Sequence, residues 1–226
     1  SRALYSTLRE LIENSLDACE LHKIKPNIQI HVLQQDQDSE EGNIYKIRIR
    51  DNGSGVPQDK ILSAFGKVFY SSKYFLRQSR GTFGLGGTMA ILYGQITTQT
   101  PIVITSSTGD DEIWSYKFLI DISQNKPKVI DKKVVSNETG WKGTIVELSL
   151  LGEYSRITHK IISYLNRVGK YSVCPYIVGF GIKARRYYGY QVLEFRYSGN
   201  DFPPSYGKST LSIFKICSGI GNRISH

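Results

Sequence analysis

Apolar residues near the start of the chain recur at helical spacing, and they predict an amphipathic helix over Arg2 to Leu21 that Pro26 stops. This stripe consists of Leu4, Leu8, Leu11, Ile12 and Cys19. A second stripe of the same period predicts a helix over Arg156 to Val168. Shorter helices are expected over Gln58 to Phe65 and Gly84 to Tyr93, which follow a proline and a glycine-rich stretch.

Alternating apolar and polar positions predict strands along much of the remaining chain. Over Ile44 to Arg50 the isoleucines are expected to face inward and the basic residues outward, and we interpret the polar stretch from Gln34 to Gly42 as a hairpin loop. Further strands are expected over Asn27 to Leu33, Ile102 to Ser106, Ile113 to Ile122, Val129 to Val135, Gly143 to Leu150, Ile177 to Ile182 and Val192 to Tyr197. The four between Ile102 and Leu150 follow one another directly, which favours antiparallel pairing.

The length and composition of the chain are typical of one large globular domain. Of its 226 residues, 40% are hydrophobic and 22% are charged. We expect this domain to cover residues 1–200. The segment Phe202-Pro203-Pro204 indicates a linker, and Lys208 to Cys217 is expected to begin a following helical module within residues 201–226.

Charge and cysteine content narrow the class of protein. The formal net charge of +9 is consistent with a polyanionic partner such as nucleic acid, or with nucleotide phosphates. The three cysteines are far apart and form no CxxC pair, which argues against a zinc site and for a reducing intracellular compartment. No run of about eighteen apolar residues occurs, so we expect no membrane association.

The polar side of the first predicted helix carries Glu10, Asn14 and Asp17 at positions i, i+4 and i+7. At roughly 100° per residue they lie within an arc of about 60°, opposite Leu4 and Leu8. A solvated helix face is one interpretation. A general base beside a Mg²⁺ ligand is the other, and Asn14 favours it slightly because asparagine is a mediocre helix former.

The loop Asp51-Asn52-Gly53-Ser54-Gly55 follows a predicted strand. These residue types are typical of a tight turn. A carboxylate at a strand end could also accept a hydrogen bond from an adenine amino group, and glycines beside it would let a flat base approach the backbone closely. The segment alone leaves both interpretations open.

A glycine-rich segment from Gly81 to Gly87 precedes a predicted helix. Its backbone N–H groups and the helix N-terminus could bind phosphates. No Gly-Lys-Ser/Thr closes it as in a P-loop, and a long loop rather than a strand precedes it, unlike a Rossmann fingerprint. Upstream, Ser72 and Lys73 either reach the phosphates or belong to an exposed basic loop.

These weak signals occur in one order: ExxxNxxDA from Glu10 to Ala18, DNGxG from Asp51 to Gly55, GxxGxG from Gly81 to Gly86, and then Gly143-Thr144. In this order the sequence resembles the GHKL (Bergerat-type) ATPases, which include gyrase B, MutL, heat-shock chaperones and histidine kinases. The segments Arg9 to Ala18, Ser71 to Tyr74 and Arg77 to Gly81 are similar to the B subunits of DNA topoisomerase VI. The resemblance runs from Ser1 to about Tyr176.

The resemblance implies an α+β fold, a two-layer α/β sandwich with a mixed, mostly antiparallel sheet and helices on one face. It implies that Glu10 polarises the water that attacks the γ-phosphate of ATP, that Asn14 holds Mg²⁺ and that Asp17 supports the nucleotide pocket. Asp51 would bind adenine, with Thr144 nearby. The rest of the implied nucleotide-binding set is Gly53, Gly55, Ser72, Lys73, Gly81, Thr82, Phe83, Gly84, Leu85, Gly86, Gly87 and Thr88, and from Ser72 onward it would close over the phosphates as a lid.

The resemblance also implies a biological role, as the ATP-hydrolysing B subunit of a type IIB DNA topoisomerase. In that family ATP binding dimerises the B subunits and gates passage of one DNA duplex through another, while an A subunit cleaves the DNA, in a heterotetramer of two A and two B subunits. The expected location is the nucleus of a eukaryote or the cytoplasm and nucleoid of an archaeon.

Two other functions compete with this role. One is a catalytically inert scaffold acting in recombination, and the intact Glu10, Asn14 and Asp51 argue against it, because a scaffold has no chemical need for them. The other is a GHKL chaperone or mismatch-repair ATPase, which the Ser-Ser-Lys-Tyr segment disfavours.

Overall fold

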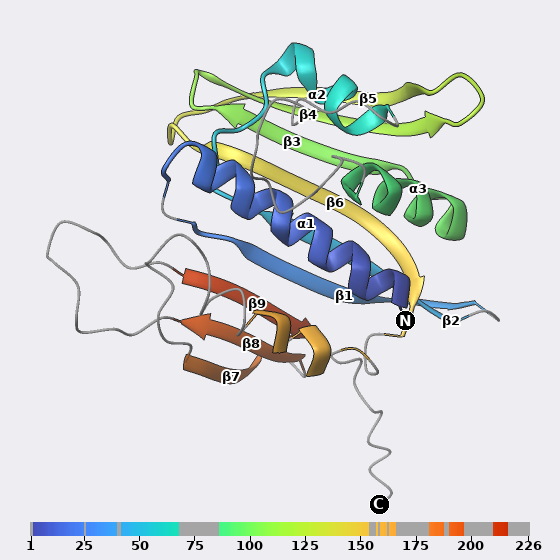
Figure 1. Cartoon of the computed structure of the whole chain (residues 1–226), viewed down its shortest axis with the longest axis vertical. Helices are drawn as coiled ribbons and strands as arrows, with labels where there is room; N and C mark the ends of the chain where they lie inside the picture. The colour runs from blue at the N-terminus through green and yellow to red at the C-terminus, as the bar shows by residue number, and fades with distance from the viewer. Residues whose placement is uncertain are drawn as a thin grey trace, which may run out of the picture.

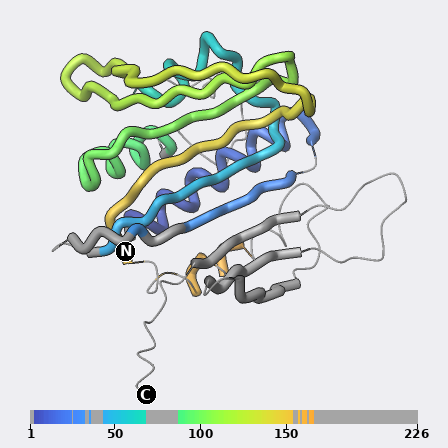
Figure 2. The backbone as a smooth tube through the Cα atoms, turned by 180° about the vertical axis from the view of Figure 1, so that it is seen from behind, coloured from blue at the N-terminus to red at the C-terminus, as the bar shows by residue number. Residues whose placement is uncertain are grey.

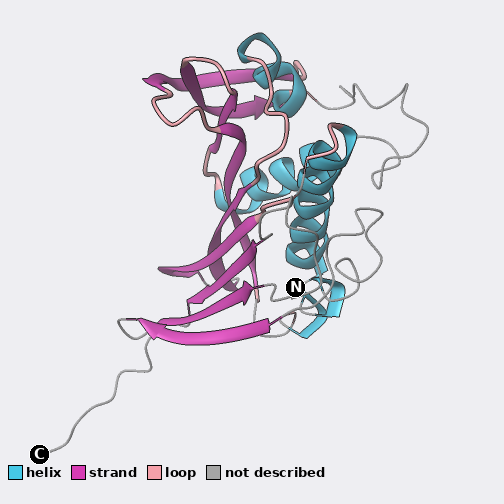
Figure 3. Ribbon diagram, turned by 90° about the vertical axis from the view of Figure 1, so that its left-hand side faces the viewer, coloured by secondary structure: helices cyan, strands magenta, loops and turns pink. Residues whose placement is uncertain are grey.

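The computed structural model describes residues 2–24, 26–39, 42–67, 86–153, 157, 159–161, 163–165, 181–187, 190–196 and 210–216. Within these residues a nine-stranded sheet has the order β5-β4-β3-β6-β2-β1-β9-β8-β7. Helices α1, α2 and α3 lie on one face of this sheet (Figures 1 and 3). The predicted α+β class, with two layers and helices on one face, is confirmed.

The helices are α1 (Arg2–Leu21), α2 (Gln58–Gly66) and α3 (Gly86–Thr98). The strands are β1 (Gln29–Ser39), β2 (Gly42–Arg50), β3 (Ile102–Thr108), β4 (Glu112–Asp121), β5 (Lys126–Ser136), β6 (Lys142–Gly152), β7 (Gly181–Tyr187), β8 (Tyr190–Arg196) and β9 (Thr210–Ile216). Residues 159–161 and 163–165 are helical, in agreement with the predicted second amphipathic helix. None of the helices in the described residues is long and apolar enough to cross a membrane.

Strand pairing is antiparallel throughout the described sheet except between β1 and β9, which run parallel. The predicted antiparallel relation of the strands between Ile102 and Leu150 is confirmed. Their order in space differs from their order in the chain, because β6 lies between β3 and β2 (Figure 2). This arrangement brings the start of β6 beside the loop that follows β2.

The core fills the space between α1 and the inner face of the sheet. Leu4, Leu8 and Ile12 of α1 are at most 1% exposed, and Ile47 and Ile49 of β2 are equally enclosed. Burial of one such side chain stabilises the fold by roughly 1.5–3 kcal/mol. The apolar stripe predicted from the sequence therefore fixes which face of α1 packs on the sheet, and leaves Glu10 and Asn14 on another face.

Two local predictions were wrong. β1 continues to Ser39 through the stretch expected to be a loop, because its backbone pairs with β2, with a register shift between Gln34 and Asp38. Residues Thr210–Ile216 form β9 rather than a helix, because β1 and β8 provide hydrogen-bonding partners on either side. The domain boundary expected near residue 200 stays a prediction.

Candidate nucleotide site

The carboxylate of Asp51 is held by groups from three different elements. Its Oδ1 accepts hydrogen bonds from the backbone N–H of Gly53 (2.9 Å) and of Thr144 (3.1 Å). Its Oδ2 accepts one from the hydroxyl of Ser15 on α1 (3.3 Å). The backbone N–H of Asp51 donates in turn to the carbonyl of Thr144 (2.9 Å). The side chain is therefore oriented by α1, by its own loop and by β6 together.

The electrostatics of Asp51 are unusual for a carboxylate. The side chain is only 6% exposed, and this burial raises its pKa from the ordinary 3.8 to about 6. The two N–H donors and the Ser15 hydroxyl oppose the rise, because they stabilise the charged form. A buried carboxylate costs folding free energy, which makes a purely structural role a poor explanation for it.

Two glycines place the loop after Asp51 directly against its neighbours. A Cβ on Gly53 would lie 2.8 Å from the Cβ of Ala18, and one on Gly55 would lie 2.0 Å from the carbonyl oxygen of Ser107. Gly55 also has φ +70°, a conformation that favours glycine. The loop therefore packs closely against α1 at Gly53 and against β3 at Gly55 and leaves no room for a side chain at either position.

The second and third residues of β6 pack against Asp51 in the same way. Gly143 has φ +143°, and a Cβ there would lie 2.2 Å from the carbonyl oxygen of Asp51. Thr144, which follows it, is 7% exposed. The Gly143-Thr144 pair, uninformative on its own in the sequence, is thus part of the cradle around Asp51.

Sequence reasoning missed Ser106 and Ser15. Ser106, fully buried on β3, accepts a hydrogen bond from the N–H of Val56 (2.8 Å), donates to the carbonyl of Gly143 (2.9 Å) and lies 3.2 Å from the Thr144 hydroxyl. It ties the two glycine-containing segments together. No sequence signal marks Ser106, whereas Ser15 could have been found because it lies one residue after Asn14 in the first motif.

The N-terminus of α3 faces the middle of α1. A Cβ on Gly87 would lie 3.0 Å from Nδ2 of Asn14, so the asparagine side chain reaches the first turn of α3. Gly86 begins this helix, and Thr88 is 3% exposed. A helix N-terminus of this length presents free N–H groups and a positive partial charge, which suits an anion.

Of the predicted site residues, Glu10, Asn14, Asp17, Asp51, Gly53, Gly55, Gly86, Gly87, Thr88 and Thr144 lie in the described segments. The structure brings Asn14 next to Gly87, and brings Asp51 together with Gly53 and Thr144. Asp17 is partly buried on the same helix. Ser72, Lys73, Gly81, Thr82, Phe83, Gly84 and Leu85 lie outside the described residues, so the predicted lid stays a prediction.

The site extends along α1. Ala18 lies against the Asp51 loop, Asn14 faces α3, and Glu10 is one turn further toward the helix N-terminus. From Ala18 to Glu10 the helix axis covers about 12 Å, comparable to an extended nucleoside triphosphate. One oxygen of Glu10 accepts a hydrogen bond from Nη2 of Arg9 at 2.8 Å. Within the described residues no group of three or more His, Cys, Asp or Glu side chains could hold a metal.

A cleft of about 390 Å³ lies between Val56 and the turn that joins β3 to β4. Asp110, Asp111 and Glu112 line it. Carboxylates repel phosphates, so this cleft does not suit the charged end of a nucleotide.

Residues 3–144 match the family described as histidine kinase-, DNA gyrase B-, and HSP90-like ATPase. The B subunit of type 2 DNA topoisomerase 6 from Metallosphaera sedula is 41% identical to this chain over 177 residues, or 78% of the chain and 32% of the relative. The protein of the same name from Saccharolobus solfataricus is 44% identical over the same shares.

This chain thus spans about a third of the length of these relatives. Among solved structures, the ATPase and transducer domains of DNA topoisomerase II from Balamuthia mandrillaris align with a TM-score of 0.46 and 13% identity, over 86% of this chain and 56% of that one.

Proposed function

The chain belongs to the histidine kinase-, DNA gyrase B-, and HSP90-like ATPase family and is homologous to the B subunit of type 2 DNA topoisomerase 6, and from this premise we propose that it binds and hydrolyses ATP with Mg²⁺. The observation that carries the proposal is the buried Asp51 carboxylate. Its Oδ1 already accepts two N–H groups, whereas among the described residues Oδ2 accepts only the long Ser15 contact at 3.3 Å. Oδ2 can therefore accept the amino group of adenine.

The phosphates and Mg²⁺ fit the other half of the site. The carboxamide oxygen of Asn14 is the hard kind of ligand that Mg²⁺ prefers. Its Nδ2 lies next to Gly87, so the side chain faces the α3 N-terminus where the phosphates would bind. When bound, Mg²⁺ would neutralise phosphate charge. Gly86, Gly87 and Thr88, with Ser72, Lys73 and the segment from Gly81 to Leu85, would surround the triphosphate.

Glu10 is the candidate general base. Its carboxylate would accept a hydrogen bond from the water that attacks the γ-phosphorus, take up the proton of that water and leave ADP and inorganic phosphate as products. Within the part of the chain that the structure describes, Arg9 bonds to Oε1 of Glu10, so the water would bind at Oε2. Asp17 would support the pocket from the same face of α1.

For the whole protein we propose the role of a type IIB topoisomerase B subunit. ATP binding would dimerise two B subunits and gate DNA passage, an A subunit would cleave the DNA, and two of each would form the complex inside the cell. The net charge of +9 supports a DNA partner.

The test uses the full B subunit with its A partner. Calorimetry should detect Mg²⁺-dependent binding of a non-hydrolysable ATP analogue, and plasmid relaxation should require ATP. Glu10→Ala should keep analogue binding and lose turnover, while Glu138→Ala, a carboxylate on an exposed turn, should keep both. Absence of analogue binding contradicts the site itself. Binding without wild-type turnover identifies the inert scaffold instead.

A further inference from the structure

Arg9 lies between two carboxylates of α1 but bonds fully to only one. Its Nη2 donates to Glu10 Oε1 at 2.8 Å, whereas its Nε lies 3.7 Å from Oε1 of Glu13. The Nε atom is buried and has no hydrogen-bond partner in the described residues. An N–H···O hydrogen bond has a donor–acceptor distance of about 2.9 Å. A movement of less than about 1 Å would therefore let Nε of Arg9 donate a hydrogen bond to Glu13.

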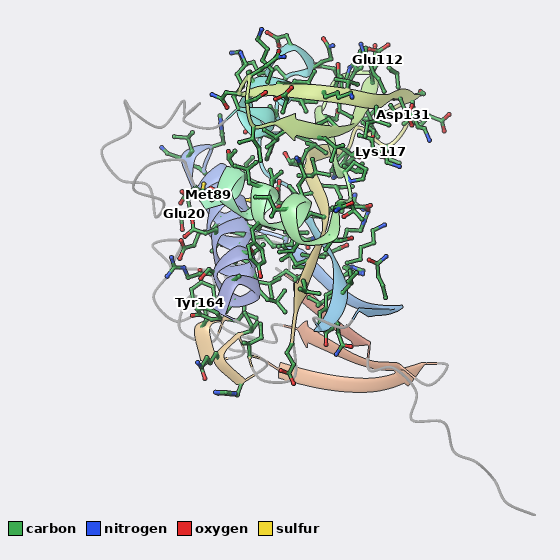
Figure 4. All side chains as sticks on the ribbon, turned by 90° about the vertical axis from the view of Figure 1, so that its right-hand side faces the viewer. Glu20, Met89, Glu112, Lys117, Asp131 and Tyr164 are labelled. Carbon is green, nitrogen blue, oxygen red and sulfur yellow. The ribbon has the colours of Figure 1, made fainter. Side chains whose placement is uncertain are left out.

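Glu13 has a second donor from a distant part of the chain. The hydroxyl of Tyr164 donates to Glu13 Oε1 at 3.0 Å, across 151 positions of sequence. The Tyr164 ring stacks edge-to-face on Tyr5 of α1, with centroids 6.3 Å apart and an interplanar angle of 80°. Figure 4 shows Tyr164 beside the N-terminal half of α1. Tyr164 is only 7% exposed, so its side chain is enclosed by its neighbours.

Tyr164 and Arg9 both stabilise the charged form of Glu13, which lies in a partly dry environment. Burial raises the pKa of Glu13, and the Tyr164 hydroxyl and then Arg9 oppose the rise. The pKa of Arg9 is raised, chiefly by its hydrogen bond to Glu10. The charged Glu13 needs donors. While the Tyr164 hydroxyl supplies one of these donors, the guanidinium of Arg9 remains hydrogen-bonded to Glu10.

We propose that Arg9 is a positioning residue for Glu10, and that Tyr164, acting through Glu13, keeps Arg9 on it. The inference rests on the proposed role of Glu10 as the general base. Arg9 holds Oε1 of Glu10 and so directs Oε2, and the helical residues 163–165 thereby influence turnover from outside the nucleotide pocket. A base displaced by about 1 Å can lose up to 100-fold in rate.

The test is steady-state ATPase kinetics of the full B subunit with its A partner, with binding of a non-hydrolysable analogue measured alongside. Tyr164→Phe should lower kcat roughly 10-fold, because Glu13 then recruits Arg9, while KM and analogue affinity stay unchanged. Adding Glu13→Gln to Tyr164→Phe should restore much of kcat, because the competing charge is gone. Arg9→Gln should lower kcat at least as much as Tyr164→Phe.

Tyr116→Phe is the matched control, because it removes another enclosed tyrosine hydroxyl, which accepts a hydrogen bond from Gln58 (2.6 Å) remote from α1. It should leave kcat unchanged. Melting curves establish folding, and Tyr164→Phe decides the question if Arg9→Gln does not fold. Unchanged kcat in folded Tyr164→Phe, a loss carried by KM, or no restoration by Glu13→Gln each overturn the proposal. Absence of turnover in the wild type overturns the proposed function as well, which separates the two failures.

Discussion

The substitution Asp51→Asn keeps the size of a buried side chain and removes its charge. The amide oxygen can still accept the N–H groups of Gly53 and Thr144, as Oδ1 does at 2.9 and 3.1 Å. An NH₂ group then replaces Oδ2 opposite Ser15, whose hydroxyl can rotate to accept from it. That NH₂ cannot accept a hydrogen bond from an adenine amino group. We therefore expect a protein that is more stable at neutral pH and does not bind ATP.

The size of the gain follows from the pKa of Asp51. Burial raises it from 3.8 to about 6, and each unit corresponds to about 1.4 kcal/mol, so ionised Asp51 costs about 3 kcal/mol of folding free energy. A raised carboxyl pKa favours the folded state below pH 3.8, and this contribution is lost as pH rises through about 6. The advantage of Asp51→Asn should thus be near zero at pH 3.8 and reach about 3 kcal/mol above pH 6.

The assay is urea unfolding of wild type and Asp51→Asn, followed by circular dichroism between pH 4 and pH 8, with calorimetry of ATP-analogue binding at pH 7.5. Asp131→Asn is the matched control, because it removes the charge of an exposed carboxylate on β5. Equal stability of wild type and Asp51→Asn at every pH would refute the argument about the buried charge. Analogue binding by Asp51→Asn at wild-type affinity would refute the assignment of Asp51 to adenine.

Two further substitutions test the cradle around the site. Gly55→Ala places a Cβ 2.0 Å from the carbonyl oxygen of Ser107 at φ +70°, so it should weaken analogue binding and destabilise the fold. The loss should be far larger than for Gly140→Ala, because Gly140 has φ +61° but open space around it. Thermal melts and calorimetry compare the two variants, and equal losses would contradict the close approach at Gly55. Ser106→Ala removes the acceptor for one partly buried N–H and a donor to a buried carbonyl, which should cost about 1–3 kcal/mol. The exposed Ser63→Ala should cost less than about 0.5 kcal/mol in the same urea titration, and a similar cost for both would count against Ser106 as a tie between the loops.

The local pattern of the chain was enough to predict most of the elements. The stripe from Leu4 to Cys19 predicts α1 with the bounds that the structure has, because an apolar face at the helical period has one way to pack. Ile47 and Ile49 are enclosed as their alternation indicates. The wrong predictions concern segments whose secondary structure depends on a neighbouring strand. The polar end of β1 pairs with β2, and Thr210–Ile216 pairs with β1 and β8. Backbone pairing overrides a weak local preference, and no window of sequence contains the partner strand.

The nucleotide site divides in the same way. The order of Glu10, Asn14, Asp51 and the glycines can be read from the sequence alone. This order indicates the family, because each motif contains residues suited to one part of the chemistry. The raised pKa of Asp51, the contribution of Ser106 and the link from Tyr164 to Arg9 come only from the tertiary structure. They depend on burial and on distances between residues far apart in the chain, such as the 151 positions between Glu13 and Tyr164. The contacts of Asp51 and Ser106 with β6 depend on the sheet order, which puts β6 beside both β2 and β3 and which no local segment encodes.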